Sequence, residues 1–339
     1  MKKHRNLSKG FWHKFVPNST KLISPQSIKL EIWDLKIHKI IEKWHPKIFC
    51  IHNCAFSQSG DKFILFGGCI GNESEFKIYD TNTFELLNEF WFPEQCCNAV
   101  FSFDDDNFIF GTWEGNIYKV NINDKIIMSE TITKIDNKTF KDYKVSEENK
   151  IKLLNIENAM ITLTESNTKN IFFFVVSPKS LNKTNDLHLL SDYILIYDLN
   201  TNETEEITLP IEEKRYRITG LKFHNNKLAI LKTNYGGEEN GNVFHNADLY
   251  ILDLQKNDLQ PVKRNFQVRD VYSKVECLAW NIEEKLSYIT LNEVVIVDTL
   301  NNNDETTIVI ERPTSVEFSD DGKRLAIGGE KKAIIHEID

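Results

Sequence analysis

Residues 312–339 read RPTSVEFSDDGKRLAIGGEKKAIIHEID, and this stretch decides the fold of the chain. Apolar residues alternate through Val316 and Phe318 before a turn of two aspartates and a glycine. Two further apolar runs follow, at 325–327 and at 333–335. Period-two apolar runs separated by Asp/Gly turns predict antiparallel strands joined by hairpins. Three such strands cannot bury both of their faces alone, so we expect similar units beside them.

Similar units occur along the whole chain. In each of them an aromatic residue ends an apolar run and is followed by a polar turn and a second apolar run. These aromatic anchors are Phe56, Phe101, Phe223, Trp280 and Phe318. A second marker, an isoleucine followed by an aromatic or aliphatic residue and usually an acidic one, closes a third strand in each unit. It begins at Ile32, Ile78, Ile117, Ile196, Ile251, Ile296 and Ile335.

A four-stranded unit that recurs about every 40–45 residues is typical of a propeller blade. The repeats resemble WD-repeat blades over about 28–339, most clearly at Ile32-Trp33-Asp34, at 111–118 (GTWEGNIY) and in the C-terminal unit. The Gly-His dipeptide that this family carries ahead of the first strand is absent, so the chain resembles a divergent member. The resemblance implies an all-β fold, a seven-bladed β-propeller of four-stranded antiparallel blades, with six blades as the alternative.

The two ends of the chain belong together in this prediction. The last blade ends at Asp339 after only three strands, and an open sheet edge favours aggregation. We therefore expect a strand from the N-terminus to close the ring, either 11–16 (FWHKFV) or a piece just before it. Residues 1–10 are expected to form a loose basic tail on a single domain that spans 1–339.

Composition restricts the classes of partner. No apolar run reaches 18 residues, so no membrane span is predicted, and six cysteines without regular spacing favour the cytoplasm. Residues 1–50 carry a charge of +8 and residues 51–339 carry −17, which together make the net charge of −9. Two interpretations stay open: a solvated surface with a basic tail, or a basic first blade that binds an acidic partner. The acidic remainder argues against nucleic-acid binding.

Long insertions indicate a binding face. With the strands of a blade named a to d from the axis outward, a–b and c–d turns lie on one face, and b–c loops and d–a connections lie on the other. The a–b and c–d turns are short. Three insertions are assigned to the b–c/d–a face: a d–a connection at 131–155, the blade-four b–c loop at 177–192 and the blade-five b–c loop at 233–248. Long loops on a rigid scaffold usually carry binding, although insertions there are also thermodynamically cheap.

Five apolar residues of these loops are candidates for contact with a protein partner, because exposed apolar and aromatic side chains are typical of binding surfaces. They are Leu187, Leu189 and Leu190 in blade four, and Tyr235 and Phe244 in blade five. The alternative is that these side chains fold back as a small core under their own loops.

The sequence offers little chemistry. It holds no phosphate-binding loop, zinc-protease motif, nucleophile elbow or EF-hand pattern. Paired Cys-x-x-Cys spacing for zinc is also missing. His52, Cys97 and Glu276 lie four residues before their anchors, where the strands would reach the mouth of the central channel, and together they could hold a metal or act as acid and base. Polar residues are common at such a position without catalysis, so we predict no enzyme, no metal and no cofactor.

These observations predict a non-enzymatic scaffold or adaptor for protein–protein interaction. Its partner would bind the b–c/d–a face over blades three to five. One alternative is a propeller that binds a small molecule or a metal, or hydrolyses a substrate, at the channel mouth. Another is an accessory or immunity-type protein that neutralises one dedicated partner. The fold does not decide among these functions.

Overall fold

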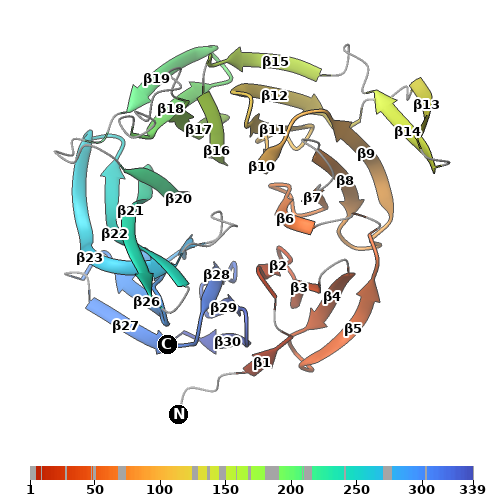
Figure 1. Ribbon diagram of the computed structural model, residues 1–339. Helices are drawn as coiled ribbons and strands as arrows, with labels where there is room; N and C mark the ends of the chain where they lie inside the picture. Colours follow the sequence, from red (N-terminus) through yellow and green to blue (C-terminus); the bar gives the residue numbers. More distant parts are fainter. Residues whose placement is uncertain are drawn as a thin grey trace. The chain divides into compact units, whose positions relative to one another are not determined.

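The structure, a computed structural model, describes most of the chain. The described residues are 5–8, 10–26, 29–46, 48, 51–67, 74–123, 129–135, 138–144, 150–157, 159–166, 169–179, 191–207, 209, 216–239, 242–269, 277–301 and 304–338. In these residues all regular structure is β, in seven four-stranded sheets and one two-stranded sheet (Figure 1). The seven sheets are the blades of a seven-bladed β-propeller, as the repeats predict. No helix in the described part is long and apolar enough to cross a membrane.

The chain divides into two compact units. The first comprises Met1–Lys47, Asn182–Ile196 and Thr204–Asp339, and the second comprises Ile48–Leu181 and Tyr197–Glu203. Blade four is divided between the two units. Its strand order is β16(Ala159–Ser166)-β17(Ile171–Pro178)-β18(Tyr193–Asp198)-β19(Glu203–Ile207).

The first unit contains blades one, five, six and seven, and the first three of these have their strands in chain order from a to d. Blade one is β2(Lys14–Phe15), β3(Lys21–Gln26), β4(Lys29–Asp34) and β5(Lys39–Trp44). Blade five is β20(Arg217–His224), β21(Lys227–Glu239), β22(Asn242–Asp253) and β23(Asp258–Arg269). Blade six is β24(Leu278–Trp280), β25(Lys285–Ile289), β26(Glu293–Asp298) and β27(Asp304–Val309).

Blade seven is completed by the N-terminus. Its strands are β28(Pro313–Phe318), β29(Arg324–Gly329) and β30(Ala333–Glu337), and β1(Arg5–Leu7) pairs antiparallel with β30 as the fourth strand. The piece just before 11–16 is therefore the closing strand, and part of 11–16 is β2, the innermost strand of blade one. Within 1–10, predicted as a loose tail, Arg5–Leu7 is thus strand.

The second unit contains blades two and three. Blade two is β6(Ile51–Phe56), β7(Lys62–Gly67), β8(Ser74–Asp80) and β9(Leu86–Phe92). Blade three is β10(Cys96–Phe101), β11(Asn107–Thr112), β12(Asn116–Asn121) and β15(Lys150–Asn155). Phenylalanines join the two blades: the ring of Phe76 lies 5.2 Å from that of Phe108 and 4.8 Å from that of Phe110, and all three side chains are buried.

One insertion lies elsewhere than predicted. Between β12 and β15 the chain forms a separate hairpin, β13(Ser129–Ile135) and β14(Lys138–Lys144). Because β15 pairs with β12 as the outer strand of blade three, the insertion at 131–155 is not a d–a connection. The hairpin interrupts the c–d connection, and residues 150–155 belong to the blade itself. The alternation of β15 (KIKLLN) is short and follows a charged stretch, so the strand is hidden in the sequence as part of an insertion.

The aspartate of the closing marker has a structural cause. In five blades it stands at the end of strand c, and its Oδ1 accepts backbone N–H groups of the following c–d turn. For Asp80 the donors are the N–H groups of Asn82 and Thr83, both at 2.8 Å. The same capping occurs at Asp34, Asp198, Asp253 and Asp298. A short carboxylate that hydrogen-bonds two residues ahead favours a tight turn.

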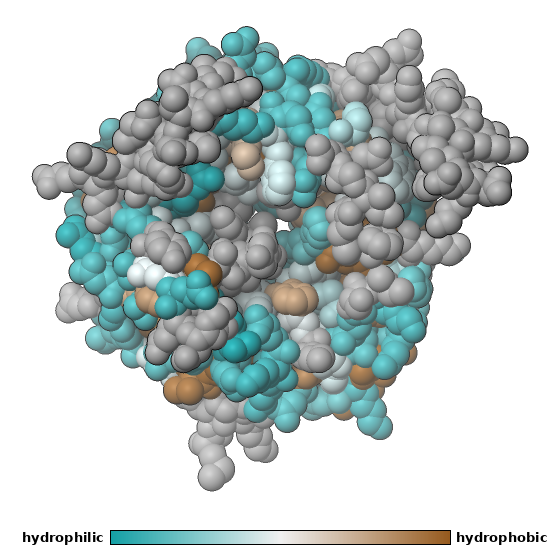
Figure 2. Space-filling view, in the orientation of Figure 1, coloured by the Kyte–Doolittle hydropathy of each residue, from teal (hydrophilic) through white to brown (hydrophobic). Residues whose placement is uncertain are grey.

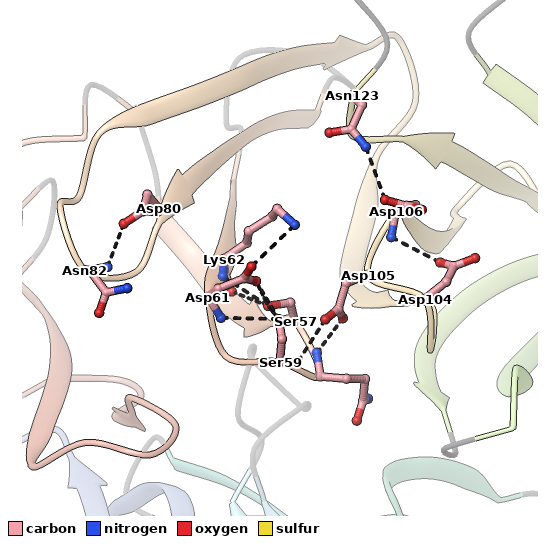
Figure 3. Close-up of polar contacts among 11 residues, drawn as sticks. Ser57, Ser59, Asp61, Lys62, Asp80, Asn82, Asp104, Asp105, Asp106 and Asn123 are labelled. Carbon is pink, nitrogen blue, oxygen red and sulfur yellow. Dashed lines mark hydrogen bonds and ion pairs between the residues drawn. The ribbon is translucent and has the colours of Figure 1, made fainter.

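The a–b turns link neighbouring blades within each unit (Figure 3). Asp105, in the turn of blade three, accepts the N–H groups of Gln58 (2.5 Å) and Ser59 (2.8 Å) in the turn of blade two. Glu284 of blade six likewise accepts Asn225 Nδ2 of blade five at 2.8 Å. Both acceptors have a left-handed backbone, with φ of 58° and 60°. Glycine fills the corresponding position in blades two and seven, at Gly60 and Gly322.

The anchor Phe101 provides a test of the core. Its side chain is 2% exposed, whereas that of Phe103, two residues later, is 53% exposed. We expect Phe101→Ala to lower the free energy of unfolding by about 3–5 kcal/mol, because it leaves a cavity between packed rings. Phe103→Ala is the matched control and should change it by less than about 0.5 kcal/mol. Urea denaturation of both variants measures the difference, and equal losses would contradict the assignment of Phe101 to the core.

Candidate functional site

A half-buried carboxylate organises the b–c/d–a face of blade three. Glu94 lies between β9 and β10 and accepts three side-chain hydrogen bonds. The donors are Thr112 Oγ1 at 2.7 Å, Asn116 Nδ2 at 2.8 Å and Tyr118 Oη at 2.6 Å. Burial opposes ionisation of Glu94, but the hydrogen bonds from Tyr118, Asn116 and Thr112 outweigh it and lower the pKa of the carboxyl. Glu94 is therefore ionised and ties the d–a connection to strands b and c.

This carboxylate fixes a tight turn that carries an exposed tryptophan. The backbone N–H of Trp113 donates to Gln95 O at 2.9 Å, and Lys179 Nζ donates to Trp113 O at 2.5 Å. Gly115 has a φ of +82°, and a Cβ there would collide with the Ile156 carbonyl oxygen. Its N–H donates to Thr112 O at 3.1 Å. The indole of Trp113 is still 38% exposed.

The blade-five insertion continues the sheet instead of forming a loop. The ladder between β21 and β22 runs from Lys227↔Asp253 to Tyr235↔His245 and, after a bulge, to Glu239↔Asn242. Strand β23 accompanies it as far as Phe244↔Arg269. Residues 234–239, 242–246 and 266–269, named here the blade-five extension, therefore form three paired strands rather than the predicted loop.

Phe244 folds back onto the extension. Its side chain is half-buried, and Cβ atoms added at Gly236 and Gly237 would lie 2.8 Å and 3.1 Å from its ring. The ring thus packs on a glycine backbone, which is the alternative that the sequence left open. Tyr235 lies in β21, but its side chain is outside the described residues, and so are Leu187, Leu189 and Leu190.

A buried ion pair supports the root of the extension. Lys232 Nζ lies 3.0 Å from Asp248 Oδ2, with side chains 3% and 15% exposed. Asp248 Oδ1 accepts the N–H of Asn265 at 2.9 Å, so the carboxylate joins strands b, c and d. Lys232 Nζ also lies 5.9 Å from the centroid of the Tyr216 ring. Breaking one partner of such a buried pair is costly, so the root is held in one geometry.

The far end of the extension is anchored to blade seven. Arg269 donates to Glu330 Oε1 at 3.3 Å, and Arg312 donates to Glu330 Oε2 at 3.1 Å. Between them, the N–H of Leu291 in blade six donates to Gln267 O at 3.1 Å. The extension therefore lies along its neighbours in the first unit and does not project freely.

Blade one has a buried histidine ahead of its first strand. His13 Nε2 lies 3.0 Å from Ser24 Oγ and 3.3 Å from Ser8 O. Burial lowers the pKa of His13 to about 4, although the Ser8 carbonyl and the Glu31 carboxylate act in the opposite direction. The imidazole is therefore neutral at pH 7.

Of the three candidate channel residues, only His52 is described with its side chain. His52 lies in β6, half-buried, and burial lowers its pKa. Cys97 lies in β10 with its side chain outside the described residues, and Glu276 is outside them altogether. Among the residues that the structure describes, no group of three or more His, Cys, Asp or Glu side chains could hold a metal ion.

Sequence reasoning missed Trp113, Glu94 and His13. Trp113 stands in the GTWEGNIY segment that carries the family resemblance, where a tryptophan next to a Glu-Gly turn signals an exposed b–c position. Glu94 had no sequence signal, because its three donors are 18 to 24 residues away. His13 follows a tryptophan rather than a glycine, so a search for Gly-His passes over it.

Among the residues coloured in Figure 2, hydrophilic ones dominate the face shown and apolar ones form small separate spots. Among exposed large apolar side chains, Trp113 has the largest ring. An aromatic side chain of this size, held by a fixed turn, is the kind of residue that dominates protein interfaces.

Comparison with known proteins supports the architecture. The chain is similar to the β-propeller domain of Cps50 (Swd1) from Myceliophteria thermophila, with a TM-score of 0.66, 15% sequence identity and 100% of both chains covered. At this identity the likeness shows the fold alone, and it agrees with the resemblance to WD-repeat blades. No protein-family model matches the sequence, and the comparison with curated proteins finds no match.

Glu94 is testable through its hydrogen bonds. We expect Glu94→Ala to lower the free energy of unfolding by about 3 kcal/mol, since it leaves three buried donors without their acceptor. Glu94→Gln keeps an acceptor oxygen and should cost roughly half as much. Chemical denaturation at pH 7 compares the two variants with the parent chain. A neutral effect of Glu94→Ala would show that these hydrogen bonds do not hold the turn.

His13 predicts a pH dependence. Its pKa is lower in the folded chain than in the unfolded one, so the unfolded state takes up the proton first as the pH falls. The stabilisation is complete above about pH 6.5 and is lost as the pH falls towards 4, by about 3 kcal/mol in total. The glutamine of His13→Gln does not titrate. The free energy of unfolding that this variant loses relative to the parent chain should therefore be smaller at pH 4.5 than at pH 7. Denaturation curves that fall in parallel for both proteins would contradict this assignment.

Proposed function

We propose that this protein is a non-enzymatic scaffold for protein–protein interaction, and that a partner binds its b–c/d–a face at the Trp113 turn. The observation that carries the proposal is the combination of exposure and rigidity at Trp113. The indole offers a large apolar surface, while its backbone is held on both sides by hydrogen bonds to Gln95 and Lys179. An anchor that is already ordered loses little conformational entropy on binding.

The surroundings of Trp113 fit a protein partner. Glu114 and Lys179 are exposed beside it and offer charges of both signs, as the polar rim of an interface does. The central apolar ring would be enclosed by a partner surface while the charged groups at the rim stay solvated. In the other unit, the blade-five extension lies on the b–c side of its own blade. Its anchored backbone supports a role as a separate contact surface.

A comparative pull-down tests the proposal. The baits are the intact chain, Trp113→Ala, and Phe103→Ala as a control with similar loss of exposed aromatic surface on an a–b turn. A fourth bait replaces 235–245 by Asn-Gly, which shortens the extension to a tight hairpin. We expect a stoichiometric protein, identified by mass spectrometry, to be retained by Phe103→Ala and reduced at least about tenfold by Trp113→Ala.

The fourth bait separates the two surfaces. If only the bait with the shortened hairpin fails to capture the protein, binding belongs to the blade-five extension instead of the Trp113 turn. Equal capture by all four baits would overturn the proposed face. Melting temperatures of all baits within about 2 °C of each other exclude unfolding as the cause of any loss.

A further inference from the structure

Blade one displays an apolar side chain through a defect in its outer strand. Ile32 of β4 pairs with Glu42 of β5, while the next residue, Trp33, pairs with Ile40, so Ile41 has no opposite residue in the register. A bulge of this kind bends the strand and re-aims a side chain. Ile41 is 47% exposed. The same defect recurs in blade two at Leu87, which is 51% exposed.

The neighbours of Ile41 are mainly basic. Lys39 and Lys43 lie on the same strand, and Lys36 lies in the preceding turn; all three are exposed. The turn also presents Ile37, which is 57% exposed. Lys36, Ile37, Lys39, Ile41 and Lys43 are named here the basic rim.

Blade one as a whole carries more lysines than carboxylates: residues 14–44 hold six lysines against Glu31, Asp34 and Glu42. Asp34 is engaged in the turn, where its Oδ1 accepts the Lys36 N–H at 2.8 Å. Glu31 is buried and lies 3.0 Å from Lys43 Nζ, whose side chain is still 64% exposed. Glu42 is the remaining exposed carboxylate of β5.

The outer strands differ in the sign of their charge. Edge strands generally carry charged side chains that prevent pairing with other chains, and either sign serves that purpose. The outer strands β19 (ETEEI) and β27 (DETTIV) are acidic, whereas β15 (KIKLLN) carries lysines as β5 does. Protection of the edge therefore explains the charge on β5, but it does not explain why Ile37 and Ile41 are exposed beside that charge.

We propose that the basic rim is a docking surface for an acidic segment of a partner protein that also carries aliphatic side chains. Carboxylates of the segment would pair with Lys36, Lys39 and Lys43, and its aliphatic residues would cover Ile37 and Ile41. A nucleic acid fits less well, because residues 51–339 carry a charge of −17 that repels phosphates. A phosphodiester backbone also has no apolar counterpart for the isoleucines. This surface is independent of the Trp113 turn.

Fluorescence anisotropy with the full chain tests the docking surface. The probe is a fluorescein-labelled peptide of four Glu-Glu-Leu repeats, and four Lys-Lys-Leu repeats form the control peptide. We expect the acidic peptide to bind at low salt, to weaken strongly at 0.5 M salt, and the basic peptide not to bind. Lys36→Glu/Lys39→Glu should weaken the binding of the acidic peptide about tenfold or more. Lys323→Glu/Lys332→Glu, an equal charge change at exposed sites on blade seven, should leave it within about twofold.

The apolar half of the surface needs its own variant. Ile41→Ser keeps every charge and should weaken the binding of the acidic peptide severalfold. If the surface were purely electrostatic, this substitution would leave the affinity unchanged. Absence of binding up to 1 mM peptide, or equal losses in both double variants, would overturn the proposal. It would also be overturned if a 12-nucleotide single-stranded DNA, or vesicles with anionic lipid, bound more tightly than the peptide and depended on the same lysines. Sedimentation of the protein without peptide tests a last alternative. If the protein self-associates and Lys36→Glu/Lys39→Glu abolishes the self-association, a second copy of the chain binds this surface and the proposal is overturned.

Discussion

The pairing of the first strand with the last is the constraint on which the first unit depends. Without β1, the outer edge of β30 from Ala333 to Ile335 would expose its backbone groups. Three side-chain contacts reinforce this pairing over about 300 residues of sequence. They are Lys14 Nζ to Glu317 Oε2 at 3.1 Å, the Asn18 N–H to Asp320 Oδ2 at 2.8 Å and Thr314 Oγ1 to Gly10 O at 3.5 Å. The N-terminal residues are therefore part of the structure. Bringing the two ends of the chain together costs conformational entropy, and this cost is incurred once for the whole unit.

The sequence predicted the parts of each blade that are buried. Of the five aromatic anchors, Phe101, Trp280 and Phe318 are buried, whereas Phe56 and Phe223 are only half-buried. The aspartates that end the c strands proved to be turn caps. These residues obey local rules, because period-two burial and a capped turn are written within a few positions of each other. The architecture and the number of blades could therefore be predicted without a structure.

Outer strands were harder to predict for a physical reason. Strand d is mostly solvated, so β19 (ETEEI) lacks apolar alternation, and β15 (KIKLLN) alternates over only four residues after a charged stretch. Both therefore look like loops in the sequence. The blade-five extension was predicted as a loop for a related reason. Beyond Thr233 its strands leave the core, and polar residues suffice to continue the ladder. The assignment of 131–155 to the wrong face follows directly from overlooking β15.

The polar contacts on the b–c/d–a face show why motif searches find so little in this chain. Each one joins strand b to the chain that precedes strand a, or to strand c, but with different groups. Blade one uses His13 and Ser24, blade three uses Glu94 with Thr112 and Tyr118, and blade five uses Lys232 with Asp248. The shared requirement is that buried polar groups be satisfied, and this requirement does not specify residue types. Partners at long sequence separation can thus be replaced together while the geometry stays.

The two surfaces that we propose differ in the physics of recognition. The Trp113 turn offers a rigid aromatic ring, whose burial would mainly govern how slowly a complex dissociates. The basic rim offers flexible lysines around two isoleucines, and such charges mainly govern the rate and orientation of encounter. The charge of the chain is divided between +8 in residues 1–50 and −17 in the remainder. An acidic segment would therefore be attracted to blade one and repelled by much of the other surface, so that the uneven distribution itself confers specificity.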